Sequence, residues 1–103
     1  MGWSSNETSD RRIVASSYWR SLNNYAGLEN RSGVYVFANS AYQVKYIGKA
    51  GPGRMVNEIY NAITRNKAYG ATQVKALYTN LDLNAQSLER DLIIKYNPPN
   101  NLR

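Results

Sequence analysis

The sequence contains neither cysteine nor histidine. The absence of cysteine excludes a disulfide framework, a thiolate metal site and a cysteine nucleophile. The absence of histidine removes the commonest general base and the commonest metal ligand. Any catalysis by this chain must therefore use tyrosine, lysine, arginine, serine, asparagine or a carboxylate.

Long hydrophobic runs are also missing, so the sequence predicts neither a membrane span nor a signal peptide. We expect a protein of the cytoplasm or the nucleoid that is not secreted and has no membrane partner. The chain has 103 residues, a length typical of one small domain. We expect a flexible N-terminus over residues 1–9 and a single domain over residues 10–103.

Acidic residues are scarce. Thirteen Lys and Arg face seven Asp and Glu, so the formal net charge is +6. Most of the excess lies in residues 33–103, where nine basic residues face four acidic ones. A basic surface is typical of proteins that bind a polyanion, most often nucleic acid. Composition alone leaves a merely basic protein equally open.

Periodicity divides the chain into helices and strands. Apolar spacing after Asp10 predicts a helix over residues 10–25. Two further helices are predicted over residues 54–66 and 84–96. β-rich runs predict strands over residues 33–38, 42–47 and 73–79. The expected fold class is α+β: a small three-stranded antiparallel sheet flanked by helices, with an added N-terminal helix.

The first two predicted strands form a hairpin with a tyrosine in each. A turn centred between Ser40 and Ala41 places Tyr35 opposite Tyr46. Directly opposed residues share a face of the sheet, with Cβ atoms about 5 Å apart. The two phenols are therefore expected together, either as an aromatic pair that only stabilises the hairpin or as part of a site.

The last predicted helix carries a carboxylate among apolar residues. Glu89 falls inside an apolar arc made of Ala85, Leu88, Leu92, Ile93 and Tyr96. A carboxylate there is costly unless it is paired, hydrogen-bonded or bound to a cation. A position at the edge of the arc, with the side chain reaching solvent, is an equal alternative.

An ordered set of motifs runs through the later part of the chain. Two tripeptides, Gly33-Val34-Tyr35 and Tyr46-Ile47-Gly48, leave ten residues between their tyrosines. Lys49 follows the second tripeptide, and Asn101 follows Glu89 by twelve residues, after Pro-Pro. In these features the sequence resembles the GIY-YIG nuclease superfamily. The resemblance covers residues 33–101, about two thirds of the chain.

The resemblance implies a GIY-YIG-like catalytic core over residues 33–101. The implied activity is that of a metal-dependent DNA endonuclease that leaves 5′-phosphate and 3′-hydroxyl ends. It uses one Mg²⁺ or Mn²⁺ per site, and Glu89 is the expected metal ligand, because a hard cation prefers oxygen and keeps several waters. The expected catalytic residues are Tyr35, Tyr46, Lys49, Arg54 and Glu89. The expected DNA contacts are Gly48, Lys49, Arg54, Tyr60 and Asn101.

Tyr35 is the candidate general base. A free phenol has a pKa of about 10, and we expect Lys49, Arg54 and the metal to favour its phenolate. Tyr46 is expected to hydrogen-bond the attacking water or a phosphate oxygen. Arg54 is expected to clamp the scissile phosphate through its forked donors.

One position departs from the family pattern. The family's arginine on the first helix falls on Val56 in this sequence, and the nearest arginine is Arg54. If Arg54 fills the same space, the site is complete; if not, the protein is slow or inactive. Tyr60 is expected to serve beside the arginine, although core packing explains it equally well.

The biological role stays open at this level. The leading interpretation is a stand-alone phage, restriction-like or mobile-element endonuclease whose partner is DNA, acting as a homodimer where both strands are cut. The alternative is a catalytically weak or inactive GIY-YIG-like module that only binds nucleic acid. A third interpretation is a specificity subunit that relies on a partner protein.

Overall fold

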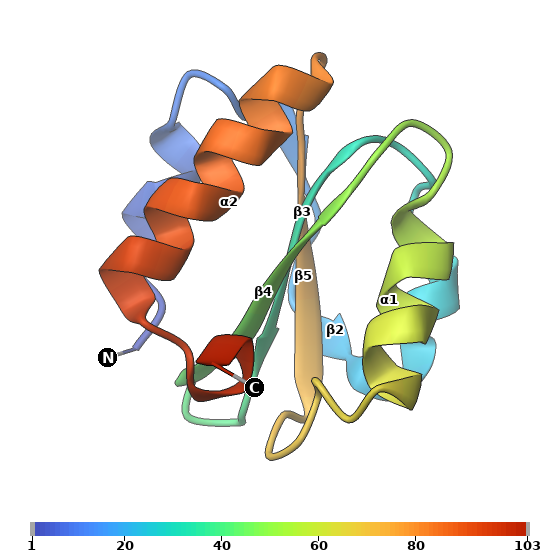
Figure 1. Ribbon diagram of the computed structural model, residues 1–103, viewed down its shortest axis with the longest axis vertical. Coiled ribbons are helices and arrows are strands. Elements are labelled where there is room, and N and C mark those ends of the chain that lie inside the picture. The colour runs from blue at the N-terminus through green and yellow to red at the C-terminus, as the bar shows by residue number, and fades with distance from the viewer. Residues whose placement is uncertain (1, 103) are drawn as a thin grey trace.

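The computed structural model describes residues 2–102. Met1, part of the expected flexible N-terminus, and Arg103, the end of the expected domain, lie outside the described residues. The fold class is α+β, as predicted, with α-helices on both faces of an antiparallel sheet (Figure 1). The strands are β1 (Ala15–Ser16), β2 (Arg20–Ser21), β3 (Gly33–Ala38), β4 (Val44–Ala50) and β5 (Gln73–Tyr78). The α-helices are α1 (Met55–Thr64) and α2 (Asp82–Tyr96), and short 3-10 helices are η1 (Ser5–Ser9), η2 (Leu22–Gly27) and η3 (Pro99–Leu102).

The sheet has five strands rather than the three that were predicted. β3 lies between β4 and β5, and β4 forms one edge. The two extra strands, β1 and β2, are short and both pair with the other side of β5. β3 and β5 match their expected ranges to within one residue, whereas β4 begins two and ends three residues later than expected. The added strands lie at the β5 side of the sheet.

The predicted helix over residues 10–25 is wrong, because this segment contains β1, β2 and most of η2. The N–H groups of Val14 and Ser17 each donate at 2.9 Å to β5 carbonyls. An edge strand presents unpaired backbone groups, and this segment covers those of β5. Ile13 packs on the α2 face and Leu22 on the α1 face. The apolar spacing that predicted a helix therefore comes from residues that pack on two different faces of the sheet.

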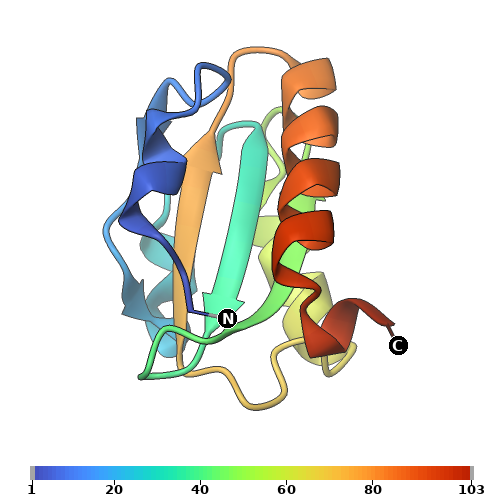
Figure 2. The ribbon, with the colours of Figure 1, turned by 90° about the vertical axis from the view of Figure 1, so that its left-hand side faces the viewer.

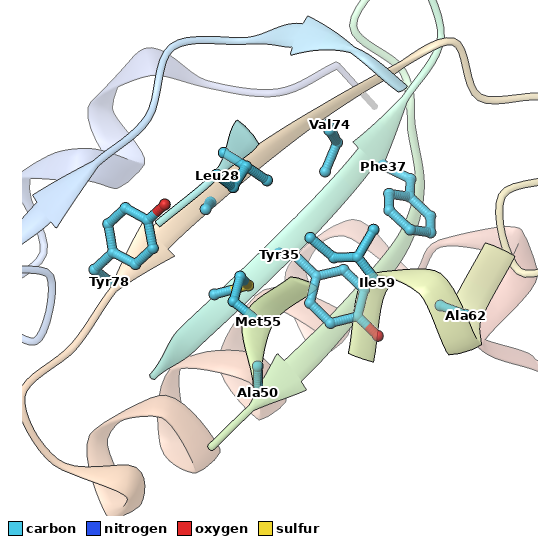
Figure 3. Packing of buried hydrophobic residues seen from close by; sticks show 10 residues of the cluster. Leu28, Tyr35, Phe37, Ala50, Met55, Ile59, Ala62, Val74 and Tyr78 are labelled. Carbon is cyan, nitrogen blue, oxygen red and sulfur yellow. The ribbon is translucent and has the colours of Figure 1, made fainter. Parts of the chain in front are cut away.

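Alternation along the strands sends side chains into two cores. The core between the sheet and α1 includes Tyr35, Phe37, Met55 and Ile59, with Leu28 after η2 (Figure 3). The core on the other face lies under α2 and consists of Val34, Val36, Val44, Ile47, Leu77, Ala85, Leu88, Leu92 and Tyr96. Trp3 and Trp19 pack against the second core.

The N-terminal segment, expected to be flexible over residues 1–9, packs beside α2 on the same face of the sheet (Figure 2). The indole of Trp3 stacks on Tyr96, with ring centroids 5.4 Å apart. The Tyr96 hydroxyl accepts from the Ser4 N–H at 3.0 Å and donates to Glu7 at 2.5 Å. These contacts attach residues 3–7 to the end of α2.

The β3–β4 hairpin has a different register from the predicted one. Its loop spans residues 39–43, and a bulge follows Phe37. Tyr35 lies opposite Gly48, and Tyr46 lies opposite Phe37. The direct Tyr35–Tyr46 pairing is therefore wrong by two residues. Because side chains alternate with a period of two, this slip leaves both phenols on the same face.

The two α-helices agree with their predicted ranges to within two residues at each end. α2 ends at Asn97, which adopts a left-handed conformation with φ 45°, a conformation that asparagine tolerates at helix ends. No helix in residues 2–102 is long and apolar enough to span a membrane.

Candidate active site

A pocket of about 260 Å³ collects side chains from β3, β4, α1 and α2 at the β4 edge of the sheet. In Figure 1, β4 lies between the two α-helices. Both helices can reach the pocket, because no further strand of residues 2–102 covers this edge. The pocket is lined by Tyr35, Tyr46, Lys49, Glu58, Asn61, Ala62, Arg65, Lys67 and Glu89.

The two predicted tyrosines meet in this pocket. Their ring centroids are 6.1 Å apart. Tyr35 is 4% exposed, and its ring lies between β3 and α1 beside Ile59 (Figure 3). Gly48 makes this position possible, because a Cβ at residue 48 would collide with the Tyr35 ring. Gly48 therefore acts here by giving the Tyr35 ring space.

The hydroxyl hydrogen of Tyr35 has two candidate acceptors. One is the Glu58 carbonyl oxygen at 3.4 Å, which is long for an O–H···O bond. The other is the Tyr46 hydroxyl, whose hydrogen bond with Tyr35 raises the pKa of Tyr35 and lowers that of Tyr46. The two phenols are therefore close enough for each to change the pKa of the other.

Burial raises the pKa of the Tyr35 phenol far above its usual value, and the charges of Tyr46, Glu58 and Glu89 raise it further. This direction is opposite to the expectation that Lys49 and Arg54 favour the phenolate. Burial also raises the pKa of Tyr46, while the nearby Arg65 guanidinium lowers it. In the protein alone, both phenols keep their protons at neutral pH.

Glu89 reaches the pocket from α2, where it is half-buried. Burial raises the pKa of its carboxyl, and the charge of Lys49 lowers it to a smaller extent. No residue in the range 2–102 gives the Glu89 carboxylate a hydrogen bond or an ion pair. A desolvated carboxylate without a direct partner is a candidate ligand for a cation.

Lys49 stands at the rim. Its Nζ lies 2.9 Å from Asp82 Oδ1 and 3.2 Å from Asp82 Oδ2. This ion pair joins the end of β4 to the first turn of α2. The position of Lys49 is therefore set by α2, the same helix that supplies Glu89.

Four predicted site residues lie outside the pocket lining, and one of them is Gly48, under the Tyr35 ring. Arg54 precedes α1, is exposed, and places a guanidinium nitrogen 3.7 Å from Glu58. Tyr60 is 54% exposed on α1. Asn101 bonds the backbone of Ile47, accepting from its N–H at 2.9 Å and donating to its carbonyl at 2.8 Å. Asn101 thus pairs with the outer edge of β4, next to Tyr46.

The pocket also contains residues that the sequence did not single out. Glu58, Asn61 and Arg65 line it from one side of α1 or just after it, and Lys67 lies in the following turn. The spacing of three and four residues among the first three is the signal that could have identified them, because it places them on one helical face.

No family model matches this chain, and no curated protein matches it.

Proposed function

We propose that this chain is a metal-dependent DNA endonuclease of the GIY-YIG type that leaves 5′-phosphate and 3′-hydroxyl ends. The observation that supports the proposal most is the pocket at the β4 edge, where Tyr35, Tyr46, Lys49 and Glu89 line one space. These residues come from three elements, and their types match the motif residues of that superfamily. A phage, restriction-like or mobile-element enzyme, working in the cytoplasm or on the nucleoid, is the proposed context.

The donor set of the pocket fits a hard divalent cation. Glu89 is desolvated and has no direct partner, and the Glu58 carboxylate lines the same pocket. No group of three His, Cys, Asp or Glu side chains within residues 2–102 could hold an ion. Mg²⁺ tolerates such a sparse site, because it keeps several waters and shares its ligands with substrate phosphates. When bound, it would supply positive charge that offsets Glu89 and polarises the phosphate.

Tyr35 is the proposed proton acceptor for the attacking water. The water oxygen bonds to phosphorus, and its proton goes to the Tyr35 phenolate oxygen. The bond from phosphorus to the 3′-oxygen breaks, and the 3′-oxygen leaves with the electron pair and takes a proton from solvent water. Because burial and the neighbouring acids raise the pKa of Tyr35, formation of its phenolate limits the rate at neutral pH. Tyr46, whose ring lies beside that of Tyr35, orients that group.

Arg65 is the proposed phosphate clamp in place of Arg54. The Arg65 side chain lines the pocket, and its charge acts on Tyr46. Arg54 lies outside the pocket lining and forms an exposed ion pair with Glu58. A guanidinium presents two parallel donors to phosphate oxygens, so an arginine of the pocket is better placed for this role.

A plasmid-nicking assay with Mg²⁺ tests the proposal. Glu89→Gln should lower the cleavage rate on the order of a hundredfold or more, as removal of a group that stabilises transition-state charge does. DNA binding measured with EDTA should persist. The matched control is Glu29→Gln, which removes the same charge from an exposed side chain and should cleave normally. Equal cleavage by wild type and Glu89→Gln would refute the metal assignment.

A second candidate function is a nucleic-acid-binding module without chemistry. The raised pKa of Tyr35 and the position of Arg54 outside the pocket favour it. The same assay separates the two functions, because such a module binds DNA and nicks nothing with Mg²⁺ or Mn²⁺. Gel filtration with and without DNA tests the homodimer that double-strand cleavage requires.

A further inference from the structure

A second pocket lies on the α2 face of the sheet, under the N-terminal segment. Its volume is about 340 Å³, and its lining includes Trp3, Ser5, Ser16, Tyr18, Trp19 and Lys75. It shares no lining residue with the tyrosine pocket, which is the pocket at the β4 edge that contains Tyr35 and Tyr46. It has no part in the proposed cleavage.

Lys75 is the charged group of this pocket. It is 9% exposed, and no carboxylate in residues 2–102 forms an ion pair with it. Its Nζ donates to the Ser17 carbonyl at 2.6 Å and lies 5.9 Å from the centroid of the Trp19 ring. An ammonium has three donors, so two are left for a ligand. A buried cation without a counter-ion favours an anion beside it.

Two exposed hydroxyls extend this donor set. Ser5 and Ser16 line the pocket, and their hydroxyls make no hydrogen bond with another residue of the range 2–102. Together with the ammonium they form a group that can donate to phosphate oxygens.

Aromatic rings form the rest of the wall. Trp3 and Trp19 meet edge to face, with centroids 6.0 Å apart. Tyr18 is 92% exposed at the mouth of the pocket. A flat, exposed ring beside a pocket offers a surface on which a planar ligand stacks.

We propose that this pocket binds one nucleotide unit, with its phosphate on Lys75 and the two serine hydroxyls and its base against Trp19 and Tyr18. A ligand that uses both halves of the wall joins an anion to a flat ring, and a nucleoside monophosphate has that form. The net charge of +6 also draws polyanions towards the chain. The ligand is either a free nucleotide or one unit of a single strand.

Tryptophan fluorescence tests the proposal directly. The chain has two tryptophans, and both line this pocket, so their quenching reports on it and not on the tyrosine pocket. Thymidine monophosphate, thymidine, inorganic phosphate and a short oligothymidylate are titrated in EDTA, where cleavage plays no part. Saturable quenching by the nucleotide, with weaker binding of thymidine and of phosphate, is expected.

The variants identify the contacts. Lys75→Met should weaken binding of thymidine monophosphate by about tenfold or more, the loss expected for a hydrogen-bonded charge. The matched control is Lys45→Met, the same change on β4 and outside this pocket, and it should bind normally. Tyr18→Ala should weaken binding by about tenfold through lost stacking. Its side chain is almost fully exposed, so the fold is kept even if Lys75→Met fails to fold.

The titrations separate the two sources of the ligand and can also overturn the proposal. Competition of the oligothymidylate with the nucleotide supports a strand as the ligand, and its absence supports a free nucleotide. Absence of saturable quenching, equal binding of phosphate alone or thymidine alone, or equal losses in Lys75→Met and Lys45→Met would each overturn the proposal. Nicking activity does not enter any of these readouts.

Discussion

At the scale of single residues, the position of the Tyr35 ring depends on the lack of a side chain at residue 48. The ring occupies the space that a Cβ there would need. The second glycine of the motif pair therefore has a packing role as well as any contact with DNA. It fixes the phenol between β3 and α1, where the pocket begins.

Gly48→Ala should destabilise the protein by about 1–3 kcal/mol, the usual cost of overpacking a core, and should displace the phenol. Guanidinium denaturation measures the free energy of unfolding. Gly51→Ala is the matched control, since the nearest atom to its Cβ is an Asp82 carboxylate oxygen at 3.9 Å, and it should change stability by less than about 0.5 kcal/mol. Equal effects of the two variants would contradict this role.

The pH dependence of cleavage should follow the Tyr35 phenol. Its pKa is raised, so below that pKa the phenolate fraction increases tenfold with each pH unit. The nicking rate of the wild type should rise with that slope between about pH 7 and 9. Tyr35→Phe should lose about a hundredfold or more in rate and should lose the slope. A variant that keeps the slope would show that another group accepts the proton.

Arg65 and Arg54 form a matched pair of arginines near the same helix. Arg65→Ala should slow cleavage on the order of a hundredfold, because a clamp on the phosphate is lost. Arg54→Ala breaks only an exposed ion pair with Glu58, and such pairs contribute at most about 1 kcal/mol. Single-turnover nicking compares the two. If Arg54→Ala is the slower variant, Arg54 is the clamp.

Much of the candidate site was predictable from motif spacing. Tyr35, Tyr46, Lys49 and Glu89 were singled out, and the structure places all four in one pocket. Arg65 was missed because the loop length was compared with a family pattern, and that comparison led to the nearest arginine in sequence. The pKa direction of Tyr35 was missed because burial and acids on other elements are invisible in a local sequence.

At the scale of the elements, the long periodic segments were predictable and the short edge strands were not. β3, β5, α1 and α2 lie close to their predicted ranges. β1 and β2 hold two residues each, too few for a period to be recognised. Their strand form depends on the free edge of β5, a partner that lies more than fifty residues away.

The predicted register of the hairpin was also wrong, because the form of the loop depends on side-chain contacts. A turn centred on two residues predicts one register, whereas the loop contains five, residues 39–43. The Asn39 side chain stabilises it by accepting from the N–H groups of Ala41 and Gln43, and Tyr42 takes a left-handed conformation with φ 63°. Side-chain bonds of this kind favour a longer loop over a tight turn.

The C-terminal 3-10 helix, η3, satisfies the outward-facing backbone groups of β4 at Ile47. Asn101 makes both backbone bonds of Ile47 that a neighbouring strand would make. Asn101→Ala should therefore cost about 1–2 kcal/mol and should speed amide exchange at Ile47. Leu102→Ala is the control, because that side chain is 75% exposed. Full stability of Asn101→Ala, or unchanged amide exchange at Ile47, would contradict this support of β4.

At the scale of the whole molecule, the tyrosine pocket and the tryptophan pocket (lined by Trp3, Trp19 and Lys75) lie at different places on one sheet. The tyrosine pocket opens at the β4 edge, and the tryptophan pocket lies beside β5. The N-terminal segment forms part of the second one, and Lys95 and Tyr96 attach it to α2 through Glu7. Loss of this attachment should therefore affect the tryptophan pocket and leave the tyrosine pocket intact.

The pH dependence of stability should be flat near neutrality and fall steeply in alkali. The chain has no histidine and no cysteine, so no side chain of ordinary pKa titrates between about pH 6 and 9. Burial raises the pKa of Tyr35, Tyr46 and Tyr78, and it raises that of Tyr96 to about 12. A group with a raised pKa in the fold stabilises it below its unfolded pKa of about 10 and loses that contribution as pH rises through the folded value. Lys75, whose pKa burial lowers, acts in the opposite direction, but it is one group against four.

Urea denaturation from about pH 6 to 12 should therefore give a constant free energy of unfolding up to about pH 9 and a steep loss beyond about pH 10. Tyr96→Phe should lower stability at neutral pH, because the bond to Glu7 is lost, and should make the alkaline fall shallower. Stability that rises above pH 10, or an unchanged alkaline slope in Tyr96→Phe, would show that these phenols do not govern the behaviour of the fold in alkali.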